Sequence, residues 1–475
     1  MIKNLVQQTN ASLGPQMKLL SRGPAAYIIT IGTVLLTFLW VYFNPLSVPV
    51  FLIFLLLSAA LLYWMPLKRN VKIALAAVFA LVLIPIVGMR NIFYLEVIFQ
   101  ISVFSALALG LNIVVGFTGL LNLGYIAFYA VGAYLWAFFG SQQPFLLHSI
   151  PGSVPPGTPF FLNPNAFYLF LFLGAGVLAL VGTLLGLPVL RVRGDYLAIV
   201  TLGFGELIRV LANNLDKPIN LTNGPQGITP IQRPDIPPFV LNAWNTILGP
   251  IIGRPIAQGE FYNLFFYVLA LVVILTVIIT VIRLDDSRIG RAWTAIREDE
   301  LAASAMGIAV VKYKLLAFAV AASFAGVMGV LFSASRTFVS PESFSFMQSI
   351  AVLTMVILGG LGSIPGVILG ATLVTILNLQ ILTWLSLGLN SLRQSGGVIP
   401  IINFAWSDLS AQLDPAKYQR MLFGMILILM MIYRPQGMIP AKRRKRELLL
   451  KRQEQAEQEA AQDQTSSEEA GHGAA

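Results

Sequence analysis

Cysteine is absent from this sequence of 475 residues, and histidine occurs only twice. Without thiolates, the chain cannot form disulfides, iron–sulfur clusters or cysteine-ligated zinc sites. The two histidines, His148 and His472, lie far apart, and neither has neighbours at the spacing of a metal-binding motif. The sequence therefore predicts no metal site.

Charge is also scarce, since Asp, Glu, Lys and Arg make up 11% of the residues, against about 25% in an ordinary soluble domain. Hydrophobic residues make up 57%, and the mean hydropathy is +0.78. A water-soluble chain of this length needs far more polar surface to cover its cores. The composition therefore predicts an integral membrane protein.

Long apolar runs predict an all-α fold, a polytopic bundle of transmembrane helices. A bilayer core needs roughly 20 apolar residues per helix, which gives about 10–12 spans here. The glycine-rich stretch Gly359–Gly366 is expected to divide the last long run, 346–387, into two helices. The other predicted spans are 25–44, 48–65, 72–88, 94–116, 120–140, 167–189, 196–214, 262–284, 313–333 and 419–434.

Basic residues orient these helices. With the N-terminus in the cytoplasm, 22 of the 31 lysines and arginines lie on the cytoplasmic side, eight lie outside, and Arg209 lies within a span. The inverse orientation would place the basic run Lys442–Lys445 outside, against the positive-inside rule. We therefore predict cytoplasmic N- and C-termini. The net charge of +10 then reflects basic loops beside an anionic leaflet, and no nucleic acid is needed to explain it.

The predicted topology divides the chain into four parts. Residues 1–24 form a cytoplasmic N-terminal segment, 25–90 form the N-terminal membrane spans, and 91–440 form the membrane core. Residues 441–475 form a charged cytoplasmic tail. Its richness in Lys, Arg, Glu, Gln and Ala favours a solvated helix followed by disorder, and we assign it no chemistry.

The segment 285–312 is a long loop on the predicted cytoplasmic side. Its middle contains good helix formers, and Gly307 is well placed to end a helix in a left-handed conformation. Short side chains on such a helix would allow another protein to approach closely. A solvated amphipathic helix explains the same pattern, so the residues alone leave docking and solvation equally open.

Within this loop, Glu300-Leu301-Ala302-Ala303 followed by Gly307 resembles the Glu-Ala-Ala-x3-Gly cytoplasmic loop of ATP-binding-cassette importer permeases. Leu301 departs from that motif at its second position. More closely, the chain resembles the larger permease subunit of branched-chain amino acid importers. The stretches that carry this resemblance are 108–134, 194–206, 222–228, 290–308, 358–370 and 433–437.

The resemblance implies an importer divided between several chains. This chain is expected to be a multi-pass permease subunit in the bacterial inner membrane, where it forms the pathway for branched-chain or related amino acids with a second permease subunit. Two cytoplasmic ATP-binding subunits and an extracytoplasmic solute-binding protein are the other expected partners. The residues expected to form the ATPase-coupling loop are Arg291, Trp293, Arg297, Glu300, Ala302, Ala303 and Gly307.

A Gly-x4-Gly-Lys-Ser/Thr phosphate loop is missing, and the sequence contains no Gly-Lys pair. The chain is therefore not expected to bind ATP in that way. The resemblance implies a transport subunit that is not an enzyme and binds no cofactor itself, with ATP and Mg2+ used by its partner subunits. Two alternatives stay open. One is an importer permease for urea or short amides, and the other is a secondary transporter that works alone.

Ionisable residues inside a span indicate a functional site or a structural ion pair. Glu206 lies about 16 Å along its helix from Asp195, at 1.5 Å per residue, which is near mid-bilayer. Arg209 follows one turn later, where the two side chains can meet. The pair either contacts a zwitterionic solute in the translocation pathway or locks two helices together.

Two asparagines, Asn112 and Asn122, are further candidates for the translocation pathway. They lie beside or within the first of two glycine-rich turns, 116–124 and 359–366. Such turns mark broken helices at a binding site in some transporters. Close helix packing through small residues explains the same glycines, and it is the simpler interpretation.

Overall fold

The computed structural model of the chain describes residues 24–65, 67–148, 157–189, 195–252, 258–394, 398–399, 404–405, 415–434 and 436–440. The predicted tail, 441–475, and the predicted N-terminal segment, 1–24 apart from Pro24, lie outside these residues. The described part is a bundle of apolar helices. It also contains a pair of two-residue antiparallel strands, β1 (Val398–Ile399) and β2 (Phe404–Ala405).

Nine helical segments in the described ranges are long and apolar enough to cross a membrane. Three shorter apolar helices, Val48–Leu62, Ile126–Phe139 and Gly424–Tyr433, coincide with three further predicted spans. The predicted polytopic helical bundle is therefore confirmed. The nine segments are Ala26–Phe43, Asn70–Arg90, Ile92–Phe117, Ala166–Pro188, Tyr196–Asn214, Gly259–Asp285, Val310–Arg336, Pro341–Gly359 and Ile364–Ser391.

The N-terminal spans form a separate group of helices. These are α3 (Pro24–Phe43), α4 (Val48–Trp64), and α5 (Arg69–Val78), which continues through the π-helical turn η1 (Phe79–Leu83) into α6 (Ile84–Arg90). The π-helical turn lies next to Pro85, which cannot donate a backbone hydrogen bond to the preceding turn. The group packs on the rest of the bundle through its own apolar cluster, in which the Phe51 ring stacks on Tyr94 at 3.9 Å.

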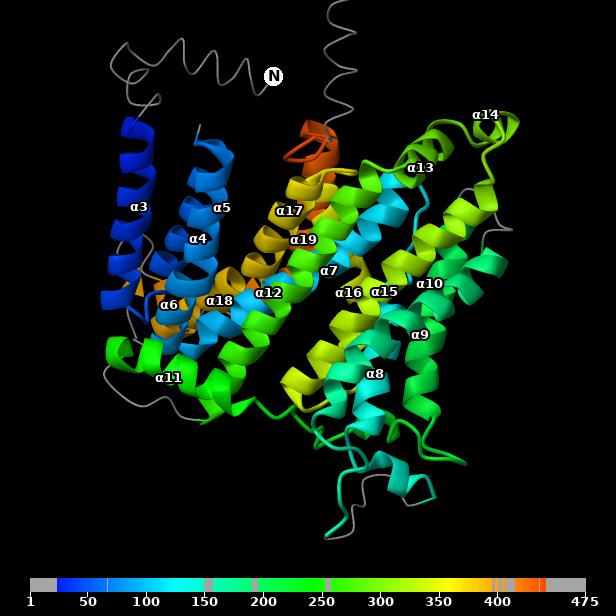
Figure 1. Ribbon diagram of the computed structural model, residues 1–475, viewed down its shortest axis with the longest axis horizontal. Helices are drawn as coiled ribbons and strands as arrows, with labels where there is room; N and C mark the ends of the chain where they lie inside the picture. Colours follow the sequence, from blue (N-terminus) through cyan, green and yellow to red (C-terminus); the bar gives the residue numbers. More distant parts are fainter. Residues whose placement is uncertain are drawn as a thin grey trace, which may run out of the picture.

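The remaining spanning helices form the core. Figure 1 shows α3–α6 on one side, α7, α12 and α17 crossing the middle, and α8, α9, α10 and α15 on the other side. The core helices are α7 (Ile92–Asn112) with η2 (Ile113–Phe117), α8 (Ile126–Phe139), α9 (Ala166–Val189), α10 (Asp195–Asn214), α12 (Gln258–Asp285), α15 (Val310–Arg336), α16 (Phe346–Gly359), α17 (Ile364–Ile376) with η6 (Leu377–Ile381) and α18 (Leu382–Gln394), and α19 (Gln419–Tyr433).

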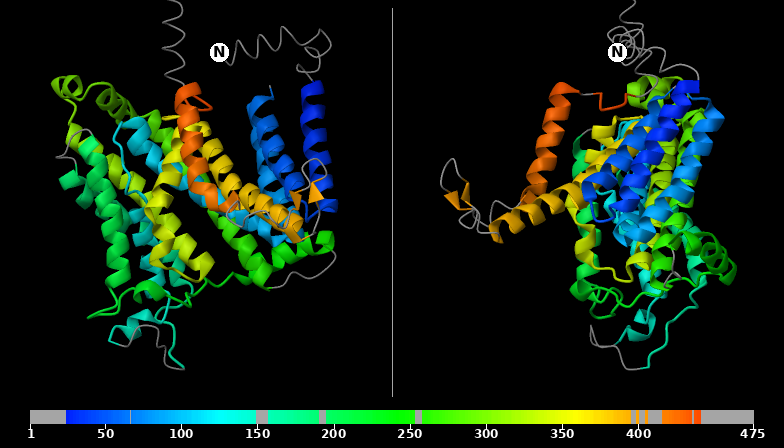
Figure 2. Two further views of the ribbon diagram at one scale, coloured as in Figure 1. Left: turned by 180° about the vertical axis from the view of Figure 1, so that it is seen from behind. Right: turned by 90° about the vertical axis from the view of Figure 1, so that its left-hand side faces the viewer.

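Short elements lie at the two ends of the bundle. At one end are α13 (Arg288–Glu298) and α14 (Glu300–Ala305), together with the start of α3 and the end of α19 (Figure 1, Figure 2). At the other end is α11 (Pro238–Ile252). The first and last described spans thus start and finish at the end that carries the 285–312 loop, as the predicted topology requires. The short 3-10 turns are η3 (Gln143–Leu146), η4 (Gly224–Gln226), η5 (Pro341–Phe344) and η9 (Pro415–Tyr418).

Glycines let α8, α9 and α15 pack with their backbones in contact. A Cβ atom at Gly132 of α8 would lie 2.4 Å from the carbonyl oxygen of Gly326 in α15, and one at Gly326 would lie 2.6 Å from that of Gly174 in α9. Apolar side chains gain little by leaving lipid for another apolar surface, so helices in a membrane often associate through small residues. These glycines therefore set the helix spacing in this part of the core.

Gly132→Ala is expected to lower the thermal stability of the purified protein. The added methyl group would force the backbones of α8 and α15 apart, and such overpacking costs about 1–3 kcal/mol. Gly176→Ala in α9 is the matched control, because a Cβ atom there has nothing within 4 Å. Thermal unfolding in detergent measures both variants, and equal midpoints would contradict this account of the packing.

Candidate functional site

One buried face attaches α13 to the core. Ser287 caps the helix, and its hydroxyl accepts hydrogen bonds from two backbone N–H groups of the first turn. Trp293 is fully buried, and its Nε1–H donates to the carbonyl of Tyr313 in α15 at 2.7 Å. Its ring also stacks on Phe117 of η2, with centroids 6.4 Å apart. The structure thus places the candidate coupling residue Trp293 inside, where it ties α13 to α15 and η2.

The two arginines of α13 make different contacts. Arg297 donates a hydrogen bond to the carbonyl of Gly116 in η2. Its side chain also runs past Gly119, where an added Cβ atom would lie 3.0 Å from the Arg297 Cγ. Arg291 is exposed and donates to the carbonyl of Asp286 at 3.4 Å. Arg297 therefore connects α13 to the end of η2, whereas Arg291 stays at the surface.

Helix α14 has only six residues and is capped at both ends. The Asp299 carboxylate accepts hydrogen bonds from two backbone N–H groups of the first turn, at 2.8 and 3.0 Å. At the other end, Gly307 has a φ of +82°. Backbone hydrogen bonds from Gly307 and Ile308 into the last turn complete a Schellman motif. The predicted left-handed helix stop at Gly307 is confirmed.

The outer surface of α14 is apolar and open. Leu301 is 73% exposed and Met306 is 83% exposed. Ala302 between them is also exposed, whereas Ala303 is buried. Leu301, the residue that departs from the Glu-Ala-Ala pattern, therefore enlarges the apolar surface of this helix.

A salt bridge attaches α14 to the spanning helix that follows it. The ammonium group of Lys314 in α15 lies 2.7 Å from a carboxylate oxygen of Glu300. Lys314 is buried, and its stem lies within the bundle while Glu300 is at the surface. A buried ammonium group needs such a partner, because an uncompensated charge away from water is costly. The salt bridge would therefore transmit a movement of α14 directly to the start of α15.

Asn112 connects α7 to the turn between α16 and α17. It is fully buried, and its Oδ1 accepts a hydrogen bond from the N–H of Gly362 at 2.9 Å. A Cβ atom at Gly116 would lie 2.1 Å from the same oxygen, so only glycine leaves room for this contact. The carbonyl of Gly116 also accepts a hydrogen bond from Arg297. Gly116 therefore connects Asn112 to the coupling loop.

The turn between α16 and α17 forms where the glycine-rich stretch predicts it. Gly360 and Gly362 have positive φ angles of +117° and +79°, a conformation that favours glycine. The segment 436–440 packs against this turn: the N–H groups of Met438 and Ile439 donate to the last two carbonyls of α16, at 2.9 and 3.1 Å. Two stretches that carry the family resemblance, 358–370 and 433–437, are far apart in the sequence but lie together in the fold.

The segment 118–125 is not helical, so the predicted span that contains it forms a helix only from Ile126 onward. Asn122 accepts a hydrogen bond from the backbone N–H two residues later, at 3.0 Å. Thr201 of α10 and Ser349 of α16 accept hydrogen bonds from two more backbone N–H groups, at 3.1 and 3.3 Å. Side chains from neighbouring helices thus satisfy the free backbone groups of the break.

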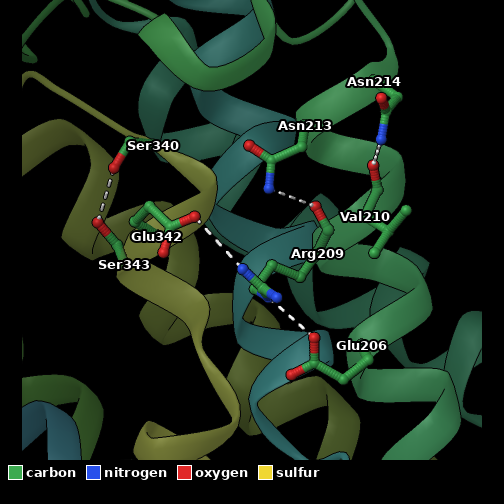
Figure 3. Close-up of polar contacts among 8 residues, drawn as sticks. All are labelled: Glu206, Arg209, Val210, Asn213, Asn214, Ser340, Glu342 and Ser343. Atoms are coloured by element: carbon green, nitrogen blue, oxygen red, sulfur yellow. Dashed lines mark hydrogen bonds and ion pairs between the residues drawn. The ribbon is translucent and has the colours of Figure 1, made fainter.

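Glu206, Arg209 and Glu342 form an ion network between α10 and η5 (Figure 3). The Nε of Arg209 lies 2.9 Å from a carboxylate oxygen of Glu206, and its Nη1 lies 3.3 Å from one of Glu342. In the isolated chain, the side chains of Glu206 and Arg209 are 34% and 29% exposed, and that of Glu342 is 71% exposed. The network has two negative charges and one positive charge, and part of each group is open to contact.

The structure does not gather all four pathway candidates into one site. Asn112 and Asn122 make their described polar contacts at the helix breaks, whereas Glu206 and Arg209 bond to each other and to Glu342. Sequence reasoning missed Glu342, because it is 133 residues from Arg209 and precedes the predicted span.

Sequence reasoning also missed a second ion pair, between the end of α15 and the start of α7. Arg336, at the end of α15, lies 2.6 Å from the carboxylate of Glu96 in α7, which also accepts a hydrogen bond from Gln100 at 3.1 Å. Glu96 lies inside a predicted span, so the rule that singled out Glu206 also applies to it. Across the described residues, no group of three or more His, Asp or Glu residues could hold a metal ion.

These features define a polytopic α-helical membrane protein with charged groups inside the bundle and a capped, exposed helix at one end. Residues 93–431 match the family model of the branched-chain amino acid transport system permease component. The chain belongs to this family, and it is a transport permease subunit.

Individual relatives agree with the family match. The chain is 36% identical to the high-affinity branched-chain amino acid transport system permease protein LivM of Escherichia coli K12, over 72% of this chain and 68% of LivM. It is 24% identical to the probable permease protein LivM of Methanocaldococcus jannaschii, over 72% of this chain and 91% of the relative. The permease protein LivH of Escherichia coli K12 is 38% identical over 19% of this chain and 29% of LivH. No solved structure matches the chain.

Proposed function

We propose that this chain is a permease subunit of an ATP-driven importer for branched-chain or related amino acids. The observation that carries the proposal is the geometry of α14. Leu301 and Met306 form its exposed apolar surface. Trp293 and Arg297 attach the preceding helix α13 to the core, and the Lys314–Glu300 salt bridge attaches α14 itself. A helix that is firmly attached to the core and open on its outer side is suited to receive force from another protein.

The proposed partners follow from this geometry and from the relatives. Two ATP-binding subunits would dock on α13 and α14 in the cytoplasm and would use ATP and Mg2+, while this chain binds neither. LivM and LivH of Escherichia coli are both named as permeases of a high-affinity branched-chain amino acid system, which supports a second permease subunit here. A solute-binding protein outside the bacterial inner membrane would deliver the amino acid. The cytoplasmic assignment of the α13 end rests on the positive-inside rule.

Force from the ATPase subunits would enter the bundle by two routes. The Glu300–Lys314 salt bridge leads from α14 into α15. The hydrogen bond from Arg297 to Gly116 leads from α13 into η2, and Asn112 continues this route to the turn between α16 and α17. A shift of the loop would therefore reach α15 and η2 through direct contacts, and the turn between α16 and α17 through Asn112. Packed interiors transmit such shifts because they compress little.

The ion network supplies chemistry that fits the proposed solute. An amino acid in transit carries a positive ammonium group and a negative carboxylate. The carboxylates of Glu206 and Glu342 can attract the first, and the guanidinium of Arg209 can attract the second. Their net negative charge favours the ammonium group. Transit requires contacts weak enough to release the solute again, and partly exposed charges are suited to that.

Uptake is expected only from the assembled importer. This chain reconstituted alone with an ion gradient should transport nothing, because its energy source is ATP hydrolysis on partner subunits. In proteoliposomes that contain all subunits, leucine with its binding protein should stimulate ATP hydrolysis. Ion-driven uptake by the chain alone would instead establish a secondary transporter. Stimulation by urea but not by leucine would establish the amide importer.

A further inference from the structure

Helix α10 has two different faces in the isolated chain. One face is buried against neighbouring elements, chiefly α8, η4 and η5, and Leu197, Thr201 and Ala212 are buried there. The other face is open, and it exposes large apolar side chains over the length of the helix. These side chains are Tyr196, Ile199, Leu207, Val210 and Leu211.

Charge distinguishes this open face from other open faces of the bundle. Glu206 and Arg209 lie at its edge, partly exposed and well inside the predicted span. The open stretches 172–184 of α9 and 272–282 of α12 contain no charged residue. A charged side chain that faces hydrocarbon is costly, so such residues normally face protein or a water-filled cavity. Lipid therefore suits α9 and α12, and it does not suit α10.

The open face of α10 also has room for a close partner. Gly203 lies one turn before Glu206, and a Cβ atom built there has nothing within 4 Å. In contrast, Gly132 and Gly326 in the core are each covered by a neighbouring helix. A glycine on an open membrane surface allows another helix to approach closely. Gly176 of α9 is equally open, so the glycine shows that a helix can approach α10 closely, and the charges distinguish α10 from α9.

We propose that the open face of α10, from Tyr196 to Leu211, is the surface on which the second permease subunit packs. The inference rests on the proposed function, which supplies that subunit. A helix of the second permease would shield the edge of the Glu206–Arg209 pair from lipid and would cover the apolar side chains beside it. The ion network then lies at the seam between the two subunits, where a shared translocation pathway would run.

Natural absence of cysteine allows a direct test with single spin labels. Leu207→Cys and Val210→Cys on α10 are the test positions, and Leu180→Cys on α9 and Leu275→Cys on α12 are exposed controls. Each labelled chain is purified alone and with the second permease subunit, in nanodiscs. Electron paramagnetic resonance then measures label mobility and accessibility to oxygen, which is concentrated in lipid.

Addition of the second permease should lower mobility and lower oxygen accessibility severalfold at both α10 positions, and it should leave the α9 and α12 controls unchanged. Unchanged, lipid-like values at α10 in a complex that co-purifies would overturn this inference and leave the proposed function intact. Immobilised labels in the chain alone would also overturn it, because a second copy of this chain would then occupy the face. Failure of the second permease to co-purify at all would remove the proposed function itself. Two test positions guard against one variant that does not fold.

Discussion

A chain with Leu301→Asp and Met306→Asp together is expected to lose its ATPase subunits and, with them, ATP-driven uptake. Both side chains are exposed on α14, and a docked protein would have to cover them. Truncated or mismatched central contacts at a binding surface cost on the order of 2–4 kcal/mol, which is roughly 30- to 1000-fold in affinity. Co-purification of the ATPase subunits and uptake into proteoliposomes measure the loss.

The matched control exchanges the two side chains, with Leu301→Met and Met306→Leu. It keeps the apolar surface and should retain both the ATPase subunits and uptake. Helix α14 should form in both variants, because its capping residues Asp299 and Gly307 are unchanged. Retention of the ATPase subunits by the aspartate variant would remove this surface from the coupling mechanism.

Glu206→Gln is expected to impair uptake strongly while the complex still assembles. The change removes one carboxylate from the ion network and leaves Arg209 with Glu342 alone, at 3.3 Å. A hydrogen bond to a charged group contributes roughly 1.5–3 kcal/mol. Loss of such a bond between Glu206 and the solute's ammonium group would raise the barrier to transit by that amount. The expected decrease in the transport rate is roughly 10- to 150-fold. Uptake of labelled leucine and co-purification of all subunits are measured side by side.

Glu342→Gln provides a graded comparison for Glu206→Gln. The contact of Glu342 with Arg209 is longer, and its carboxylate is more exposed, so the loss of uptake should be smaller. Normal uptake by Glu206→Gln would exclude this pair from the pathway. Loss of assembly, with the loss of uptake that follows from it, would make Glu206 and Arg209 a structural ion pair.

Local sequence predicts much of the fold. Each predicted apolar run contains a helix, because backbone groups in lipid must bond within their own segment. Gly307 ends α14, and Gly360 and Gly362 turn the chain between α16 and α17, because these positions require positive φ. The loop 285–312 is helical in its middle, as its helix formers predict.

The start of α8 illustrates where local reasoning fails. The apolar pattern predicts a helix from about residue 120, but the chain stays non-helical through Tyr125. Hydroxyl groups of Thr201 and Ser349 satisfy the backbone of this break. Both residues belong to helices that follow much later in the chain, so nothing near residue 120 reveals them.

By itself, the sequence determined which segments are helical and where the charged loop lies, because apolar length, glycines and capping residues act within a few positions. Only the tertiary structure decided that Trp293 points inward, that Arg209 has two carboxylate partners, and that the segment 436–440 covers the turn after α16. The first two of these join residues 20 and 133 positions apart. Such contacts depend on how whole helices pack, and no local pattern specifies which distant side chain completes them.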